Sequence, residues 1–291
     1  MTGVQGWWAG GRHVTLPVAG RDRRIFVRDE GSGPPLVLLH GYPGSSFEWA
    51  GVWPALAAAH RVVALDLLGF GASDKPARHR YRLAEQADLV EALLRELEIG
   101  AFSVLAYDYG TIVVQELLAR GVLPERVVLS NTGLFPDLYR PRRVQKLSVA
   151  PVVGTLLAAL AANERTFRET WSAVYSREHP LDPVQAAQHW QALRAGGPGR
   201  TLQRRLLDYI PERRAAGARY AAAIQDNSAR LSFLWGLQDP VSGSAIAAAL
   251  PERLTDPDLV TYPDAGHCPH IEIPDRFAAD VLARTAPDRS R

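Results

Sequence analysis

Three side chains in this sequence have the types and the surroundings needed for nucleophilic and acid–base chemistry: Asp108, Asp239 and His267. Each follows a short apolar stretch, so each is expected near the carboxyl end of a buried strand. In a parallel sheet those ends share one edge, and ligands bind beyond that edge. An aspartate, a second aspartate and a histidine that meet there could act as nucleophile, orienting acid and base.

The residues around Asp108 predict a sharp turn between a strand and a helix. Residues 101–105 are apolar with a β-branched valine, and residues 111–120 carry apolar side chains at helical spacing before Gly121. This order is typical of a nucleophile elbow, G-x-S-x-G, with Ala106 in place of the first glycine and Asp108 in place of serine. A carboxylate is already ionised at neutral pH, so it can attack a saturated carbon without a base.

The rest of the chain predicts the scaffold for these residues. Strands are expected at 13–18, 24–28, 35–39, 61–65, 127–130, 231–235 and 259–262. Helices are expected at 47–59, where Pro54 could break or restart the helix, and at 83–97, 111–120, 244–250 and 274–286. Strands that alternate with helices indicate a mostly parallel sheet covered on both faces. Residues 135–229 lack a strand pattern, so we expect a helical cap inserted between two parts of a core domain, 1–134 and 230–291.

Composition excludes several classes of function. The apolar fraction is 47% and the net charge is +2, which gives no reason to expect nucleic acid or an anionic membrane as partner. Cys268 is the single cysteine, so no intrachain disulfide can form and a cytoplasmic location is expected. The longest apolar run, 147–162, is short for a membrane span and contains Pro151 and Gly154, so a buried or interfacial helix is expected. No spacing of ligand residues suggests a metal, and no cofactor is expected.

Five stretches together resemble the α/β-hydrolase fold superfamily, in the branch of epoxide hydrolases and haloalkane dehalogenases that use an aspartate nucleophile. They are residues 40–43 (HGYP), 66–73 (DLLGFGAS), 107–110 (YDYG), 236–239 (GLQD) and 266–269 (GHCP). The run through residue 76 is similar to the mesoderm-specific transcript proteins. The resemblance implies an α/β-hydrolase fold with a mostly parallel eight-stranded sheet flanked by helices and an inserted helical cap.

The resemblance also implies roles for these residues. Asp108 would form an ester with a small hydrophobic substrate, and His267, oriented by Asp239, would activate the water that hydrolyses this ester. The backbone N–H groups of Tyr42 and Tyr109 are the expected oxyanion donors. Water and a small epoxide-type molecule are the expected partners, and the chain is expected to be a monomer or a homodimer.

Two positions bear on the choice of substrate. In haloalkane dehalogenases a tryptophan follows the nucleophile and an asparagine or a second tryptophan completes the halide site, whereas this sequence has Tyr109 and, in the HGxP loop, Tyr42. Epoxide hydrolases also commonly carry tryptophan after the nucleophile. They protonate the opening epoxide with two cap tyrosines, for which Tyr209 and, more loosely, Tyr175 are candidates, although either could be a core residue.

Three functions therefore stand as hypotheses. Hydrolysis of an epoxide to a vicinal diol leads, because the local halide donors are missing. Haloalkane dehalogenation, with cap tryptophans as the halide site, is the second. A non-catalytic, ligand-binding member of the fold is the third.

Other polar residues near the motifs are expected to support the structure. His40 should brace its loop, and Glu272 should order the loop that follows His267. Asp66 and Ser73 should have architectural roles. Asn131 stands at the alternative position for the orienting acid and has no carboxylate to fill that role.

Overall fold

The computed structural model describes residues 3–135, 137–138, 163–197 and 201–286. The predicted apolar helix at 147–162 lies outside these residues, as does part of the predicted cap. Within the described residues, no helix is both long enough and apolar enough to cross a membrane.

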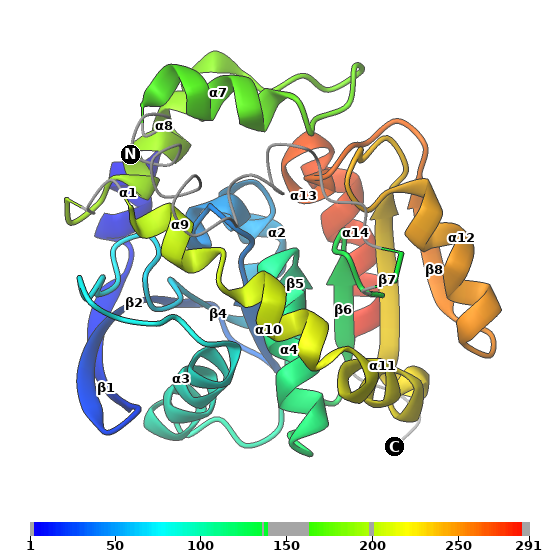
Figure 1. Ribbon diagram of the computed structural model, residues 1–291, viewed down its shortest axis with the longest axis horizontal. Helices are drawn as coiled ribbons and strands as arrows, with labels where there is room; N and C mark the ends of the chain where they lie inside the picture. Colours follow the sequence, from blue (N-terminus) through cyan, green and yellow to red (C-terminus); the bar gives the residue numbers. More distant parts are fainter. Residues whose placement is uncertain (1–2, 136, 139–162, 198–200, 287–291) are drawn as a thin grey trace.

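The core of the fold is one eight-stranded sheet in the order β1-β2-β4-β3-β5-β6-β7-β8 (Figure 1). The strands are β1 (Arg12–Val18), β2 (Arg21–Glu30), β3 (Pro35–Leu39), β4 (Arg61–Leu65), β5 (Ser103–Tyr107), β6 (Val127–Ser130), β7 (Leu231–Gly236) and β8 (Asp258–Tyr262). The β1–β2 and β2–β4 pairs are antiparallel, and all the other pairs are parallel. The predicted mostly parallel sheet of an α/β-hydrolase fold is thereby confirmed.

Helices cover both faces of the sheet, which is why its central strands are continuously apolar. The helices α3 (Leu83–Glu96), α4 (Tyr109–Ala119) and α12 (Ser244–Arg253) contribute to one core cluster. The helices α1 (Val4–Ala9), α2 (Trp53–Ala57) and α14 (Pro274–Thr285), with the 3-10 helix η1 (Ser46–Gly51), contribute to the other. Every residue of β5 and β6 is buried between these layers.

The helix predicted at 47–59 is two shorter helices. The 3-10 helix η1 ends at Gly51, and α2 begins at Trp53 with Pro54 in its first turn. Proline is compatible with the first turn of a helix because the N–H that it lacks would have no intrahelical partner there. Pro54 therefore accompanies the start of a new helix.

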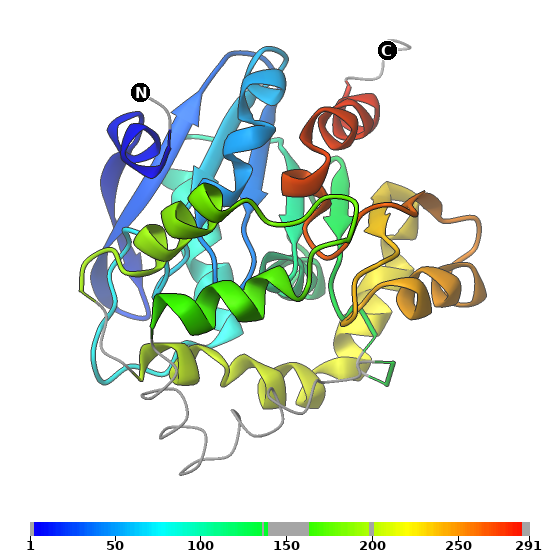
Figure 2. The same ribbon diagram turned by 90° about the horizontal axis from the view of Figure 1, so that it is seen from above.

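The described elements between β6 and β7 are all helices. They are α7 (Glu164–Ser172), α8 (Pro183–Leu193), α9 (Leu202–Leu206), α10 (Tyr209–Ala215), α11 (Gly217–Asp226) and the 3-10 helix η2 (Ser228–Arg230). Figure 1 shows α7 and α8 beyond the carboxyl ends of β5, β6 and β7, and Figure 2 shows the same helices from above. The expected active-site edge of the sheet therefore faces these helices.

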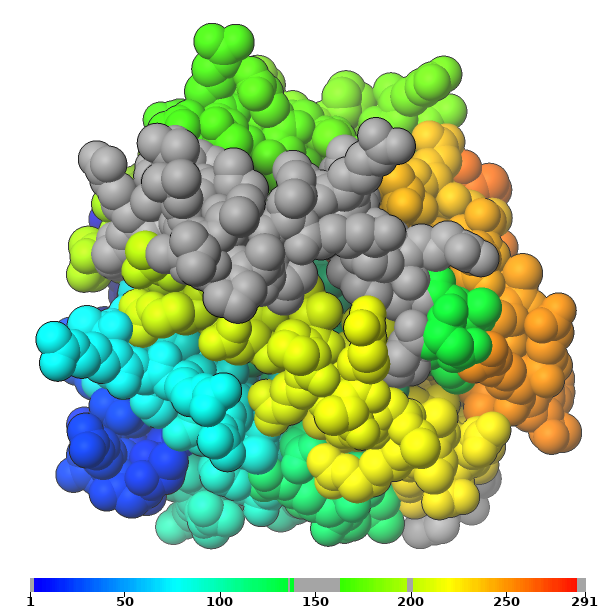
Figure 3. All heavy atoms as spheres, viewed as in Figure 1, coloured from blue at the N-terminus to red at the C-terminus, as the bar shows by residue number. Residues whose placement is uncertain are grey.

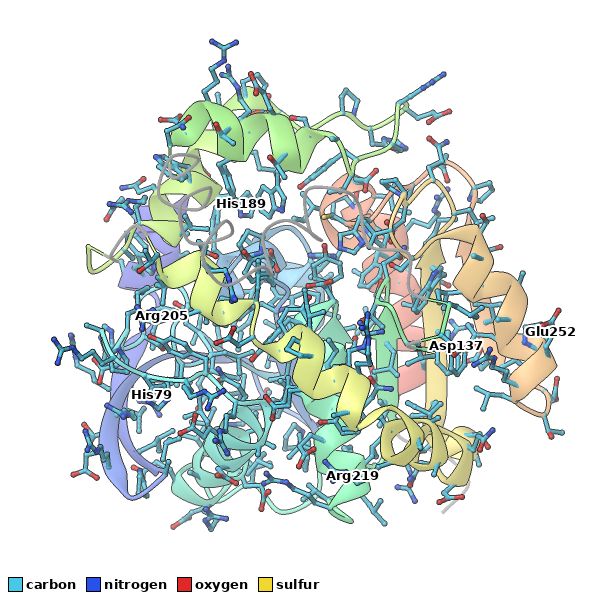
Figure 4. All side chains as sticks on the ribbon, viewed as in Figure 1. His79, Asp137, His189, Arg205, Arg219 and Glu252 are labelled. Atoms are coloured by element: carbon cyan, nitrogen blue, oxygen red, sulfur yellow. The ribbon has the colours of Figure 1, made fainter. Side chains whose placement is uncertain are left out.

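The later helices of this segment pack on the core helices. Leu83 N–H at the start of α3 donates to Glu212 of α10 (3.2 Å), and Arg205 of α9 donates to the carbonyl of Pro76 (3.1 Å). In Figure 3, α9 and α10 (yellow-green to yellow) lie beside the cyan segment that contains Pro76 and Leu83. Figure 4 labels Arg219 of α11, which pairs with Glu116 of α4. This ion pair attaches α4, the helix that follows Asp108, to the inserted helical segment.

Candidate active site

Asp108 occupies a strained turn between β5 and α4. Its φ of 45° and ψ of −110° lie outside the regions that non-glycine residues prefer. Such strain persists only where the surrounding structure enforces it, and it clusters at functional sites. The neighbouring Gly110 is required by close approach, because a Cβ there would overlap the carbonyl oxygen of Leu39 in β3. The strand β5 ends at Tyr107, two residues after the predicted strand end at residue 105. Asp108 is therefore the single residue between β5 and α4.

The three predicted residues meet at the carboxyl edge of the sheet. His267 Nε2 lies 3.5 Å from Asp108 Oδ2, and His267 Nδ1 lies 2.7 Å from Asp239 Oδ2. The side chain of Asp239 is fully buried, that of His267 is 9% exposed and that of Asp108 is 17% exposed. Asp108 is therefore the member of the three that is most open to an incoming molecule.

Asp239 is held ionised by its partners. Its Oδ2 accepts hydrogen bonds from Asn131 Nδ2 (3.0 Å) and from the Ser242 hydroxyl, and its Oδ1 accepts from Val241 N–H (2.7 Å). Burial alone would raise its pKa, but the adjacent His267 and these donors lower the pKa to about 2. Asn131 also pairs with the backbone of Gly236, so it positions the carboxylate that it could not itself supply.

His267 carries a positive charge between two carboxylates. Burial lowers its pKa, but the charges and hydrogen bonds of Asp239 and Asp108 outweigh burial and raise the pKa to about 10. The loop that carries His267 is tied down by Glu272, which accepts hydrogen bonds from the N–H groups of Gly266 (2.8 Å) and Cys268 (3.0 Å). The predicted role of Glu272 in ordering this loop is confirmed.

One of the two expected oxyanion donors already contacts Asp108. The N–H of Tyr42 donates to Asp108 Oδ1 over 2.9 Å. Tyr109 is the first residue of α4, where backbone N–H groups have no intrahelical acceptor and are available to an anion. His40 donates from Nδ1 to the Gly41 carbonyl (2.8 Å) and accepts at Nε2 from Leu67 N–H (3.0 Å). It therefore braces two loops, as predicted.

Asp66 and Ser73 have the architectural roles expected of them. Asp66 accepts hydrogen bonds from the N–H groups of Ser46 (2.7 Å) and Ala72 (2.7 Å). The Ser73 hydroxyl donates to the Asp66 carbonyl (2.6 Å) and accepts from Phe26 N–H (2.9 Å). Both residues join the loop after β4 to neighbouring segments.

The structure places the two candidate cap tyrosines in different surroundings. The Tyr209 ring, on α10, lies 5.0 Å from the Tyr109 ring and 6.3 Å from the Tyr42 ring, between centroids. Tyr175 lies in the other core cluster, near Trp171. Its hydroxyl is buried and makes no hydrogen bond within the described residues. Tyr209 thus lies beside Tyr42 and Tyr109, the neighbours of Asp108, whereas Tyr175 interacts with Cys268, the neighbour of His267, and with Glu48.

Tyr42 and Tyr109, the two residues whose backbone N–H groups are the expected oxyanion donors, also carry side-chain hydroxyls. The Tyr42 hydroxyl donates to the carbonyl of Gln203 over 3.3 Å. The Tyr109 hydroxyl is buried without a hydrogen-bond partner in the described part of the chain, and burial raises its pKa. Neither hydroxyl contacts Asp108, so these side chains supply no donor in the place of the dehalogenase tryptophan and asparagine.

Sequence reasoning missed one buried acid beside the site. Glu48 of η1 is 3% exposed, and its Oε2 accepts a hydrogen bond from Gly41 N–H over 3.0 Å. A single glutamate in a short helix follows no motif that would mark it. Only the folded chain shows that it adjoins the loop of the oxyanion donor.

Metal binding finds no support in the described residues. Among them, no group of three or more histidine, cysteine, aspartate or glutamate side chains is arranged to hold a metal ion. The acid and histidine residues of the site contact one another instead.

The chain is similar in sequence to a known family of proteins. The family model described as alpha/beta hydrolase fold matches residues 34–274. The chain is 37% identical over 287 residues to LipZ of Mycobacterium tuberculosis, named provisionally as a hydrolase, with 96% of this chain and 97% of LipZ covered. It is 33% identical over 290 residues to the human mesoderm-specific transcript homolog protein, with coverage of 94% and 85%. It is 29% identical over 269 residues to haloalkane dehalogenase 2 of Mycobacterium tuberculosis, with coverage of 90% and 91%.

Proposed function

The chain belongs to the alpha/beta hydrolase fold family, and on that premise we propose that it hydrolyses an epoxide to a vicinal diol through an ester on Asp108. The observation that carries the proposal is the position of this carboxylate at the elbow. Asp108 accepts from Tyr42 N–H at 2.9 Å and lies 3.5 Å from His267. A carboxylate at this position forms an alkyl ester where a serine would form an acyl ester.

In the first step, an Asp108 oxygen attacks a ring carbon of the epoxide. The C–O bond of the ring breaks, and the electron pair leaves on the epoxide oxygen. The hydroxyl of Tyr209 protonates that oxygen. The support for this role is that the Tyr209 ring packs against the rings of Tyr42, whose N–H contacts Asp108, and Tyr109, which follows Asp108 in the chain. The product is a hydroxyalkyl ester of Asp108.

In the second step, His267 takes a proton from water and the water oxygen attacks the carboxyl carbon of Asp108. The N–H groups of Tyr42 and Tyr109 stabilise the resulting oxyanion. Its collapse breaks the ester C–O bond, and the departing alkoxide takes the proton of the added hydroxyl, so the diol leaves and the carboxylate is regenerated. The proton on His267 then returns through solvent to the Tyr209 oxygen. Asp108 is among the groups that raise the pKa of His267. Esterification removes that negative charge, so it lowers the pKa of His267 at the stage when the imidazole must act as a base.

The surroundings of the site favour an epoxide over an alkyl halide. A departing halide ion needs N–H donors aimed at it. The side chains of Tyr42 and Tyr109 carry no N–H group, the Tyr42 hydroxyl donates to the Gln203 carbonyl, and the Tyr109 hydroxyl is buried. An opening epoxide needs only one acid and stays attached to the ester. Tyrosine suits that role because its hydroxyl is protonated at neutral pH.

Haloalkane dehalogenation is the second candidate. It uses the same ester and the same hydrolysis step, and the relative of this chain named haloalkane dehalogenase 2 supports it. Here Trp171 and Trp190 would have to supply the halide donors. The two candidates therefore differ in the leaving group and not in the nucleophile.

Diol release from a panel of aryl and alkyl epoxides tests the proposal. Wild type should turn over, Asp108→Ala should not, and Asp226→Ala, a change at an exposed residue of α11, should match wild type. Halide release from bromoalkanes, measured in parallel, would favour the second candidate. Inactivity of the wild type in both assays would contradict both proposals and favour a ligand-binding member of the family.

A further inference from the structure

We infer that Glu48 is a positioning residue for the oxyanion donor: its carboxyl group holds the His40–Gly41 peptide through the Gly41 N–H and so sets the direction of the next N–H, that of Tyr42, toward Asp108. Glu48 does not touch the expected position of the substrate and has no part in the two chemical steps proposed above. The inference concerns the loop beside the nucleophile. Its kinetic part depends on the proposed function, whereas its structural part does not.

Two successive N–H groups of the loop are divided between two carboxyl groups. Gly41 N–H donates to Glu48 Oε2 over 3.0 Å, and Tyr42 N–H donates to Asp108 Oδ1 over 2.9 Å. The carbonyl of Gly41, in the same peptide group as the Tyr42 N–H, accepts from His40 Nδ1 over 2.8 Å. Glu48 therefore fixes the His40–Gly41 peptide, and the His40 side chain fixes the Gly41–Tyr42 peptide that follows it. Together these two contacts orient the Tyr42 N–H toward Asp108.

The loop is shaped around the Glu48 carboxyl group. A Cβ at residue 44 would overlap this carboxyl group, so a side chain at Gly44 and the observed position of Glu48 exclude each other. Gly44 is absent from the residues with positive φ, so the conformation of its backbone does not require glycine. The glycine here provides space, and Glu48 fills it.

The protonation state of Glu48 should affect the oxyanion on Asp108, because Glu48 lies among other titratable groups of the site. Asp108, His267, Asp66, Tyr107, Tyr175 and Cys268 all interact electrostatically with it. Burial, together with the Asp108 and Asp66 charges, raises its pKa to about 8 although the Gly41 hydrogen bond and His267 oppose the shift. At neutral pH the carboxyl group is neutral, so it can accept from Gly41 without repelling an oxyanion that forms on Asp108. Its ionisation above about pH 8 would oppose that oxyanion.

Three variants separate these effects. Glu48→Leu removes the acceptor and keeps most of the volume. Gly44→Ala displaces the carboxyl group and leaves Glu48 in the chain. Glu48→Gln keeps an acceptor for Gly41 but cannot ionise. Glu116→Leu is the control, because Glu116 is equally buried (4% exposed) and its partners are Arg120, Arg219 and Tyr220.

The structural readout is the Tyr42 amide signal in protein labelled with ¹⁵N-tyrosine, which contains nine tyrosines. The signal is assigned by its loss in Tyr42→Phe. Glu48→Leu and Gly44→Ala should move it upfield as the hydrogen bond to Asp108 weakens, whereas Glu48→Gln and Glu116→Leu should not. An unchanged Tyr42 signal in Glu48→Leu that retains cooperative thermal unfolding would overturn the inference. This readout needs no substrate, so it is independent of the proposed function.

The kinetic readout is diol release. Glu48→Leu and Gly44→Ala should lower kcat about 10- to 100-fold. This loss should not exceed the loss caused by removing an oxyanion donor altogether. KM should change by less than about twofold. Wild type is expected to lose rate above about pH 8, and Glu48→Gln should keep kcat at pH 7 without that alkaline fall. A wild-type alkaline limb in Glu48→Gln would contradict the electrostatic part. Absence of turnover in wild type would instead count against the proposed function and leave the amide result to decide the positioning role.

Discussion

His267 Nε2 lies 3.5 Å from Asp108 Oδ2, a distance that is long for a hydrogen bond and still within the range of an ion pair. The opposite ring nitrogen is held tightly by Asp239 at 2.7 Å. The imidazole is thus anchored on the side of the orienting acid and loosely placed on the side of the nucleophile. This asymmetry suits a base that must act on a water beside Asp108 and not on Asp108 itself.

Loss of the base should trap the ester. In His267→Gln the first step remains possible, because the Asp108 carboxylate needs no base, whereas hydrolysis should slow about 10²- to 10⁴-fold. Intact-protein mass spectrometry after incubation with a reactive epoxide should show one added substrate mass. The double variant His267→Gln/Asp108→Ala is the control, and an adduct that persists in it would place the ester on another residue.

Removal of the Tyr209 hydroxyl should slow epoxide opening. We expect Tyr209→Phe to lower kcat/KM for diol formation about 10²-fold, since a general acid contributes about 10²- to 10⁴-fold and water can replace it in part. Tyr175→Phe should have a smaller effect, because the Tyr175 hydroxyl is buried without a hydrogen bond in the described residues. Steady-state kinetics of both variants checks this, and the reverse order of effects would assign the acid to Tyr175.

The charge of His267 should make the stability depend on pH. Its pKa is raised from the usual 6.5 to about 10 in the folded chain, so its contribution is complete below pH 6.5 and is lost as the pH rises through 10. The slope between these values approaches about 1.4 kcal/mol of unfolding free energy per pH unit. Urea unfolding of wild type and His267→Gln at several pH values measures it. Parallel pH dependences of the two proteins would contradict the prediction.

A second carboxylate beside Asp239 should lower both the turnover rate and the thermal stability. Asn131→Asp would replace the donor at 3.0 Å by a like charge, so the two carboxyl groups would compete for one proton. We expect loss of turnover at neutral pH of about tenfold or more and a lower thermal midpoint. Partial recovery of the thermal midpoint toward acidic pH should follow from protonation of the pair. Asn131→Leu, which removes the hydrogen bond without adding charge, should lack that recovery.

Much of the fold follows from local sequence pattern. Continuous apolar runs between polar turns predicted the buried strands, because a strand covered on both faces has no polar side to show. The small residues around Asp108 predicted the turn between β5 and α4. The helical stretch predicted at 47–59 is two helices, and the second begins beside Pro54, the residue that indicated a break or a restart.

The sequence by itself determined which residue types stand at the strand ends: a carboxylate at the elbow, a second acid after β7 and a histidine after β8. Only the tertiary structure decided which neighbouring residues contact these side chains and position them. Asn131 reaches Asp239 across 108 residues, and Tyr42 reaches Asp108 across 66. Glu48 and Tyr209 likewise acquire their places from the packing of separate segments. The reason is physical: local propensity acts over one turn or one strand, whereas contacts between distant segments depend on how the layers of the fold pack together.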